Sequence, residues 1–384
     1  AEVVDDVRGG IGRIRFQERD EINVGHVHTG YLRGNYNTPM ARICIVPRVE
    51  GLSGVASFRL KFEQALRARG VDVTNSLSEF ADAILVLAGT RNLIPLWRAR
   101  RRGRRIVQRL DGVNWVHRVR WAGLKYSLRA MYGNWNLSFI RRRLADQVIY
   151  QSQFIRGWWE DWYGAARIPS SVILNGVDLD RYSPLGLHER PSGHFRLLIV
   201  EGSLTGALNS GLFHAAELAE KLSRRFTVEL CIAGKVDRRT QNKLQDRGAF
   251  RIRFLDAIPR DQIPWLMRSS HLLFSVEVNP PCPNSVIEAL ACGLPVVGFD
   301  TGSLAEIVQG DAGRLAPYGA NQWKLEQPEL QPLASAAEEM LMNNDQFRAS
   351  ARKQAESAWG LERMTEEYLK ILLEAASSPP GTAA

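Results

Sequence analysis

The sequence predicts an α/β protein with two parallel β-sheets, each covered by helices and each opening onto a shared cleft. Short apolar runs rich in β-branched residues alternate with helical patterns, which is typical of parallel sheets wrapped by helices. This alternation runs through the first half of the 384 residues and starts again after the polar segment 184–194. Open parallel sheets bind ligands at the carboxyl ends of their strands, so we expect a binding cleft where the halves face one another.

The first half contains one strand–loop–helix unit followed by further strands. A buried strand at 42–46 leads through a glycine loop into a helix at 58–69. In that loop, the backbone amides of Gly51, Ser53 and Gly54 are suited to a close approach to a ligand, although an ordinary strand-to-helix turn has the same composition. Further extended segments are predicted at 71–73, 83–87, 105–109 and 147–150.

The second half repeats this organisation and ends in helices. Its predicted strands are 195–200, 227–233, 251–255, 271–275 and 295–298, and its predicted helices are 212–222, 284–292, 331–345 and 346–376. Because this length favours more than one domain, we expect three parts. They are an accessory segment 1–40, a domain 41–186 joined by a C-terminal helix at about 358–376, and a domain 187–357.

Composition excludes several classes of protein. A hydrophobic content of 45% is enough for a large core and excludes a disordered chain or a small disulfide-stapled scaffold. The four cysteines have no metal-ligand spacing, so we expect neither disulfides nor a cysteine metal site. No apolar run has the length of a signal peptide or a membrane span, which predicts a cytoplasmic protein.

Positive charge is concentrated between Trp97 and Arg143. This basic aromatic segment holds fourteen Lys or Arg residues and a single acid, Asp111, among interleaved tryptophans and tyrosines. Arginine beside indole rings suits an anionic interface, which predicts peripheral attachment to the inner face of the cell membrane. The alternative is a solvated basic helix face with its tryptophans in the core. A further alternative, less favoured, is nucleic-acid binding through this segment, which predicts steeply salt-dependent affinity.

A proline-rich stretch precedes the predicted helix at 284–292. Pro280, Pro281 and Pro283 stiffen the turn, and Asn284 or Ser285 is predicted to cap the helix. A helix start of this kind binds phosphate through its free amides. Glu288 lies on the same face one turn later, where a carboxylate accepts hydrogen bonds from two sugar hydroxyls. The alternative is a proline turn with a capping Asn and a solvated Glu.

Cys282 lies within the same stretch, between Pro281 and Pro283. A helix start lowers the pKa of a nearby thiol, which would make Cys282 reactive. The alternative is a small packing residue.

The segment 282–308, CPNSVIEALACGLPVVGFDTGSLAEIV, resembles the glycogen-synthase-like retaining glycosyltransferases of family four, which have the GT-B fold. The resemblance covers about 41–376 and is strongest from 195 to 320. Supporting segments are 151–154, 175–178, 232–234, 254–260 and 310–314.

The resemblance implies a nucleoside-diphosphate sugar as the donor substrate, with no cofactor and no metal. It places the diphosphate at the helix start, the ribose on Glu288, and the base near the loop 254–260. A glycan or lipid-linked acceptor is expected on the first domain. The residues expected to bind the nucleotide sugar are Gly51, Ser53, Gly54, Gly202, Ser203, Gly234, Lys235, Ile258, Asn284, Ser285, Val286 and Glu288.

Three departures from the family pattern concern catalysis. The family has an acid eight residues before the ribose carboxylate, where this chain has Pro280, so Glu277 is the predicted substitute. The family's histidine after the fourth strand corresponds to Asp111, which is the second predicted catalytic residue, unless it is only a turn residue before Gly112.

The loop 201–209 also lacks the two cations of the family, and Lys235 and Arg260 are the nearest replacements. These losses leave an alternative function open. It is a catalytically impaired GT-B protein that binds sugar nucleotides or glycans, or that acts as a membrane assembly protein.

Overall fold

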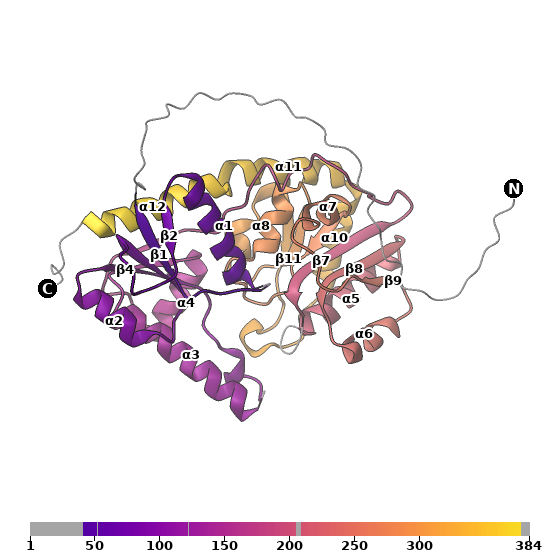
Figure 1. The fold of residues 1–384 in the computed structure, drawn as a ribbon. Coiled ribbons are helices and arrows are strands. Elements are labelled where there is room, and N and C mark those ends of the chain that lie inside the picture. Colours follow the sequence, from indigo (N-terminus) through magenta and orange to yellow (C-terminus); the bar gives the residue numbers. More distant parts are fainter. Residues whose placement is uncertain (1–40, 52, 122, 205–208, 378–384) are drawn as a thin grey trace, which may run out of the picture. The chain divides into compact units, whose positions relative to one another are not determined.

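The computed structural model describes residues 41–377 except positions 52, 122 and 205–208. The predicted accessory segment 1–40 therefore lies outside the described residues, as do residues 378–384. Within the described residues the chain forms two six-stranded sheets, and every strand pairing is parallel (Figure 1). This confirms the predicted α/β architecture.

The first sheet has the strand order β2-β1-β3-β4-β5-β6. Its strands are β1 (Arg42–Val46), β2 (Asp72–Thr74), β3 (Ala83–Leu87), β4 (Arg105–Leu110), β5 (Gln147–Tyr150) and β6 (Ser170–Val172). All five residues of β3 are buried, as expected for a strand covered on both faces. Strand β1 pairs with β2 on one side and with β3 on the other, so the order reverses there.

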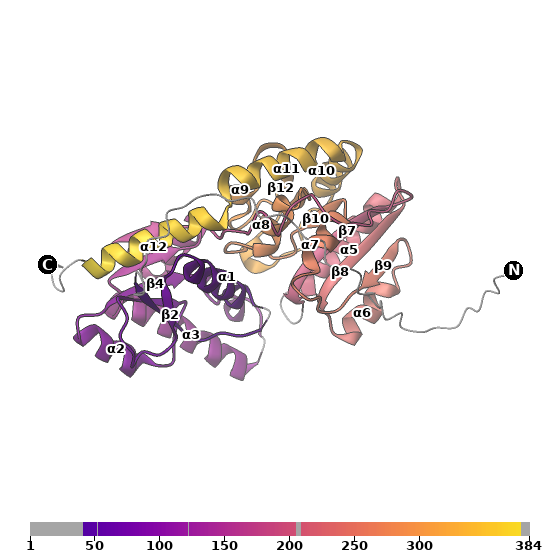
Figure 2. The ribbon, with the colours of Figure 1, turned by 45° about the horizontal axis from the view of Figure 1, so that its top comes forward.

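Helices cover both faces of the first sheet. On one face lie α1 (Gly54–Ala68) and α12 (Leu361–Ser377), whose apolar side chains meet in one core (Figure 2). The rings of Phe58 and Phe62 lie 5.3 and 5.2 Å from the ring of Tyr368. The other face is covered by α2 (Leu93–Arg101) and α3 (Leu124–Arg143). Helix α4 (Gln153–Tyr163) follows β5 and packs its tryptophans in a separate core.

The second sheet has the order β12-β11-β10-β7-β8-β9, with the reversal between β7 and β10. Its strands are β7 (Phe195–Ser203), β8 (Val228–Lys235), β9 (Arg251–Phe254), β10 (Leu272–Phe274), β11 (Val296–Phe299) and β12 (Gly313–Ala316). Both sheets lie inside the predicted domain ranges 41–186 and 187–357, and the limits of those ranges remain predictions.

The helices of the second half again cover two faces. On one face lie α5 (Asn209–Ser223) and α10 (Gln331–Met342), and on the other lie α7 (Ile263–Arg268), α8 (Asn284–Ala291) and α11 (Asn344–Ala358). Two shorter helices are α6 (Arg238–Gln245) and α9 (Leu304–Ile307).

The predicted single helix 346–376 is wrong, because the chain breaks it into α11 and α12. The break lies at Trp359 and Gly360. Val177 donates its N–H to the Trp359 carbonyl at 2.8 Å, and its own carbonyl accepts from Leu361 at 2.8 Å. The break lets α11 pack on the second sheet while α12 packs on the first.

The alternative interpretation of the basic aromatic segment, with its tryptophans in the core, holds only for Trp115. Trp115 is buried, whereas Trp97, Trp121 and Trp135 are exposed by 46%, 78% and 52%.

Candidate active site

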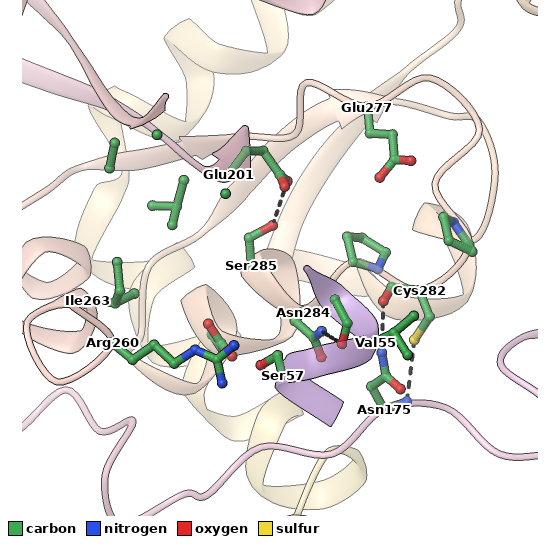
Figure 3. A pocket seen from close by; sticks show the side chains of 18 of the residues that line it. Val55, Ser57, Asn175, Glu201, Arg260, Ile263, Glu277, Cys282, Asn284 and Ser285 are labelled. Atoms are coloured by element: carbon green, nitrogen blue, oxygen red, sulfur yellow. Dashed lines mark hydrogen bonds between the residues drawn. The ribbon is translucent and has the colours of Figure 1, made fainter. Parts of the chain in front are cut away.

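A cleft of about 320 Å³ lies at the carboxyl ends of strands from both sheets. From the first half it is lined by residues that follow β1, β4 and β5, and from the second half by residues at or after the ends of β7, β8 and β10. These positions flank the points where each strand order reverses, which is where open parallel sheets bind ligands. Figure 3 shows the side chains around the cleft.

Helix α8 begins in the cleft with its first amides uncapped. The predicted cap by Asn284 or Ser285 is wrong, because Pro283 is the N-cap residue and no side chain caps the helix. Both polar side chains have other partners: Asn284 Oδ1 accepts from Lys61 Nζ at 3.2 Å, and Ser285 Oγ donates to Glu201 Oε1 at 3.2 Å (Figure 3). The unpaired N–H groups and the positive end of the helix dipole therefore make a site for an anion.

Glu288 lines the cleft one turn further along α8. Burial raises the pKa of its carboxyl, while the charges of Lys61 and Arg260 act in the opposite direction. Lys61 Nζ, from α1, lies 3.7 Å from Glu288 Oε1 and also donates to the Gly176 carbonyl at 3.0 Å. The carboxylate that the sequence predicts for a ribose therefore has a cation beside it from the other half of the chain.

A second buried cation, Arg109, lies at the end of β4 and lines the cleft. Its guanidinium stacks 3.8 Å from the centre of the Phe58 ring and donates to Asn175 Oδ1 at 2.8 Å. Asn175 in turn donates its backbone N–H to Cys282 Sγ at 3.3 Å and its side-chain amide to the Cys282 carbonyl at 2.9 Å. Arg109 and Asn175 thereby hold the loop in front of α8.

Cys282 is a buried packing residue. Burial raises the pKa of its thiol to about 11. This favours the packing interpretation over the reactive-thiol interpretation, because the thiolate is the reactive form.

The two predicted catalytic acids both line the cleft. Asp111 follows β4, and Trp159 Nε1 holds its backbone by donating to its carbonyl at 2.8 Å. Glu277 follows β10. Burial, and then the charge of Asp111, raise the pKa of Glu277 to about 7. The structure therefore brings these acids from opposite halves close enough to influence one another's charge.

A third acid, Glu201, lies in the second half of β7 at the cleft. Burial, and then the charge of Glu277, raise the pKa of Glu201 to about 8. This carboxyl is mostly protonated at neutral pH, so it is able to donate a hydrogen bond there. It stands at the start of the segment 201–209, in which the family resemblance predicts cations.

Pro280 does not line the cleft, although the family has an acid at this position. The loop turns at Asn279, whose φ is 57°, and the Pro280 carbonyl accepts from Ser303 N–H at 2.9 Å. A Cβ atom at Gly302 would lie 2.4 Å from the Pro280 nitrogen, so glycine is needed at that contact. This bend leaves Glu277 in the lining, and its role as the substitute acid stays a prediction.

Of the two predicted replacement cations, only Arg260 lines the cleft. It reaches in from the loop after β9 (Figure 3). Its guanidinium donates to the Gly51 carbonyl at 3.1 Å. It forms no ion pair with a described residue. Lys235 is exposed at the end of β8 and is not among the lining residues, so its role there stays a prediction.

The other predicted residues divide into two groups. Gly54, Gly202, Gly234 and Ile258 line the cleft. Gly234 has a φ of 149°, and a Cβ atom there would lie 2.1 Å from the Glu201 carbonyl oxygen, so only glycine lets β8 approach β7 here.

Gly51, Ser53, Ser203 and Val286 are not among the lining residues. Ser53 instead caps α1, Val286 is buried in the core, and the Ser203 side chain lies outside the described parts of the chain. These are roles of the side chains, so the contacts predicted for the backbone amides of Ser53 and Val286 stay predictions.

Sequence analysis missed Lys61, Arg109 and Glu201 as residues of the site. Lys61 looks like an ordinary polar position of an amphipathic helix, and Arg109 ends a strand pattern. Glu201 carried a signal that went unused, because a carboxylate next to a glycine at a strand end is typical of an α/β ligand site.

Among the described residues, no group of three or more His, Cys, Asp or Glu is arranged to hold a metal ion.

Comparisons with known proteins agree with this geometry. The family model described as Glycosyltransferase Family 4 matches residues 35–181. The model described as Glycosyl transferases group 1 matches residues 197–341. A comparison with curated proteins finds no match.

Solved structures with the same fold cover most of the chain. Sucrose-phosphate synthase from Thermosynechococcus elongatus is 15% identical with a TM-score of 0.68, over 88% of this chain and 100% of that one. The Anabaena protein HepE in complex with UDP-glucose is 17% identical with a TM-score of 0.62. The match covers 87% of this chain and 100% of HepE. A glycosyltransferase from Rickettsia africae is 16% identical with a TM-score of 0.60. The match covers 89% of this chain and 100% of the other.

Two parallel sheets that share a cleft at their switch points define the GT-B class of proteins. Because each half also matches a glycosyltransferase domain model, the chain is a glycosyltransferase of the GT-B type.

None of the helices in the described residues is both long enough and apolar enough to cross a membrane.

Proposed function

We propose that the protein transfers a sugar from a nucleoside-diphosphate sugar to a glycan or lipid-linked acceptor, with retention of configuration and without a metal or cofactor. The observation that carries this proposal is the uncapped start of α8 with Glu288 one turn later, both lining one cleft. Free amides suit the diphosphate, and the carboxylate suits the vicinal hydroxyls of a ribose.

The donor fits the cleft in one direction. With its diphosphate at Asn284 and Ser285 and its ribose at Glu288, the base lies toward Ile258 and the transferred sugar toward Asp111 and Glu277. The Anabaena relative in complex with UDP-glucose makes UDP the first nucleotide to test.

Transfer breaks the bond between the anomeric carbon and the β-phosphate oxygen through an oxocarbenium-like state. Negative charge grows on the leaving diphosphate, and the α8 amides and Arg260 stabilise it. The leaving phosphate accepts the proton of the acceptor hydroxyl as the new glycosidic bond forms on the same face. Asp111 and Glu277 orient hydroxyls of the sugar or the acceptor.

A calorimetric titration tests the donor site directly. UDP and GDP are titrated into the wild type, Glu288→Gln, and the control Glu366→Gln, whose side chain is exposed on α12. We expect one nucleotide to bind and Glu288→Gln to weaken it about tenfold or more, because a charged acceptor is lost. No binding by either nucleotide, or equal affinity for all three proteins, would contradict the proposal.

Catalysis and retention need a separate measurement. Incubation with a UDP-sugar or GDP-sugar, followed by NMR of the anomeric proton of the product, shows whether transfer occurs and with which configuration. A protein that binds the donor but neither hydrolyses nor transfers it would instead be a catalytically impaired sugar-nucleotide-binding protein.

We also propose that the first half attaches peripherally to an anionic membrane on the cytoplasmic side. The supporting observation is the exposed face of α3, where Leu128 and Met131 are exposed by 57% and 58% beside Lys125 and Arg129. Apolar and basic side chains on one helix suit the boundary of an anionic bilayer. A lipid-linked acceptor would be presented from that surface.

A further inference from the structure

A second cavity, of about 540 Å³, lies apart from the residues that line the cleft. Its walls come from α4 and from two short 3-10 helices, η1 (Val116–Arg118) and η4 (Gln322–Lys324). Its volume lies within the range of small-molecule sites. The lining residues are Trp115, Arg118, Val119, Phe154, Gly157, Trp158, Asp161, Trp162 and Trp323.

The aromatic rings form a fixed platform to which both halves of the chain contribute. The Trp323 ring, from the second half, lies 4.9 Å from the Trp158 ring at an interplanar angle of 70°. It lies 5.4 Å from Trp115 and 6.0 Å from Phe154. Edge-to-face and stacked contacts at these distances hold the rings in place before any ligand binds.

Two charged side chains lie at this cavity without an ion-pair partner. The Arg118 guanidinium stacks 3.9 Å from the centre of the Trp162 ring, and Asp161 is exposed on α4. Neither forms a salt bridge with a described residue, and the indole N–H of buried Trp158 has no hydrogen-bond partner there. The cavity therefore combines apolar flat faces with an unused carboxylate and guanidinium.

A smaller cavity shares one lining residue with the aromatic cavity and one with the reaction cleft. It is lined by Trp115, Val116, Ser210, Val276, Glu277, Val278 and Leu325. Glu277 lines both this smaller cavity and the cleft, and Trp115 lines both it and the aromatic cavity. The three cavities therefore adjoin through Glu277 and Trp115, and this is the order in which we place an extended acceptor.

We infer that the aromatic cavity binds a sugar ring of an extended glycan acceptor, at least one unit removed from the hydroxyl that is glycosylated. A pyranose offers an apolar C–H face that stacks on an indole, and hydroxyls that pair with Asp161 and Arg118. A lipid tail fits less well, because it would leave the two charged groups desolvated and unpaired. This assignment rests on the proposed glycosyltransferase function and names the acceptor class.

An array of defined saccharides from one to six units, probed in the presence of UDP, tests the assignment. The variants are Trp162→Ala, Trp162→Phe, and the control Trp121→Ala, which removes an exposed tryptophan outside the cavity. We expect Trp162→Ala to weaken binding of saccharides of two or more units by roughly five- to tenfold, Trp162→Phe to bind at nearly wild-type strength, and Trp121→Ala to change nothing. Asp161→Asn reports the hydroxyl contact without changing the shape of the side chain.

Several outcomes would overturn the sugar assignment. One is that the wild type binds no saccharide of two or more units. Another is that Trp162→Ala and Trp121→Ala change saccharide binding equally. Vesicles containing a polyprenyl phosphate form a second arm, and loss of vesicle binding alone in Trp162→Ala would assign the cavity to a lipid. Parallel UDP titrations separate this inference from the proposed function. Trp162-dependent saccharide binding without UDP binding would keep the cavity and reject the donor site.

Discussion

Lys61 Nζ lies 3.7 Å from Glu288 Oε1, and the two residues belong to opposite halves of the chain. Lys61 also donates to Asn284 Oδ1 at 3.2 Å and to the Gly176 carbonyl at 3.0 Å. Burial lowers the pKa of Lys61, and the charge of Glu288 opposes that change. One cation thus contacts the start of α8, the proposed ribose carboxylate and the connection between the two sheets.

Replacing Lys61 by Met is expected to weaken both folding and donor binding. Breaking a buried pair leaves Glu288 without its cation, which costs about 3 kcal/mol of unfolding free energy. The pKa of Glu288 then rises further, so more of it is protonated at neutral pH and affinity for UDP or GDP falls. Urea unfolding and calorimetry measure the two effects.

The signature of this coupling is its pH dependence. In Lys61→Met, nucleotide affinity should recover as pH rises and Glu288 ionises, whereas Lys61→Met with Glu288→Gln should not recover. The double variant should also lose less stability than the sum of the single changes. Additive losses, or a pH-independent affinity in Lys61→Met, would mean that Lys61 does not act through Glu288.

Glu201 is expected to make donor binding weaken in alkaline solution. Its pKa of about 8 leaves it protonated at neutral pH beside Ser285, where the diphosphate is proposed to bind. As pH rises through that value the carboxyl becomes charged and repels the diphosphate. The affinity of the wild type for UDP or GDP should fall above pH 8. Glu201→Gln should keep, above pH 8 as well, the affinity that the wild type has at pH 7.

The same carboxyl predicts how stability depends on pH. A folded pKa of about 8 against the ordinary value of 4.5 for a glutamate means that the folded state retains a proton that the unfolded chain releases. Stability from Glu201 is therefore complete below about pH 4.5 and is lost as pH rises to about 8. The unfolding temperature should decline with pH between these limits less steeply in Glu201→Gln than in the wild type. An unchanged slope would show that Glu201 is not protonated in the folded protein.

Arg260 is expected to be the cation that stabilises the leaving diphosphate. Removing one electrostatic donor from a transition state typically costs about 10²–10³ in rate, so Arg260→Ala should lose that much in kcat. Arg260→Lys should regain part of the loss. Lys235→Ala is the control, since Lys235 is exposed outside the lining and should keep wild-type turnover. Equal losses in Arg260→Ala and Lys235→Ala would reject this role.

All four cysteines are expected to be unreactive in the native protein. Burial raises the pKa of Cys44 and Cys282 to about 11 and of Cys231 and Cys292 to about 12. A thiol-specific chromogenic reagent at pH 8 should therefore label none of them until urea unfolds the chain and exposes all four. Rapid labelling of Cys282 in the native state would instead restore the interpretation of a reactive thiol in the cleft.

The α3 surface is expected to bind anionic vesicles. Lys125 and Arg129 are exposed on α3, and each is expected to contribute about 1 kcal/mol near an anionic surface, so Gln at both positions should weaken flotation more than tenfold. Leu128→Ser tests the apolar contribution. Leu185→Ser is the matched control because Leu185 is exposed by 81% and lies outside this helix. Flotation that none of these changes affects would reject the membrane surface.

Much of the architecture followed from local sequence patterns. Strands β3 and β5 have the predicted bounds, and β1 and the body of α8 agree as well. Apolar periodicity and turn residues are properties of neighbouring positions, so they predict these elements directly. Glu288 was predicted for the same reason, since its place relative to the helix start depends only on helix geometry.

The errors arose where distant segments compete for the same groups. The cap of α8 was mispredicted because Lys61 and Glu201 take the side chains of Asn284 and Ser285. The long C-terminal helix was mispredicted because Val177 pairs with the backbone on both sides of Gly360. Neither partner is detectable from the local pattern, since Lys61 and Asn284 are 223 positions apart.

The sequence by itself determined two parallel sheets, their order along the chain, and a helix start followed by a carboxylate. Only the tertiary structure decided which cations reach that helix, that Glu277 and not the position of Pro280 lines the cleft, and that burial raises the pKa of Glu201. The physical reason is that strand and helix formation depend on neighbouring residues. A side chain's charge state and partners depend instead on burial and on segments that meet only after folding.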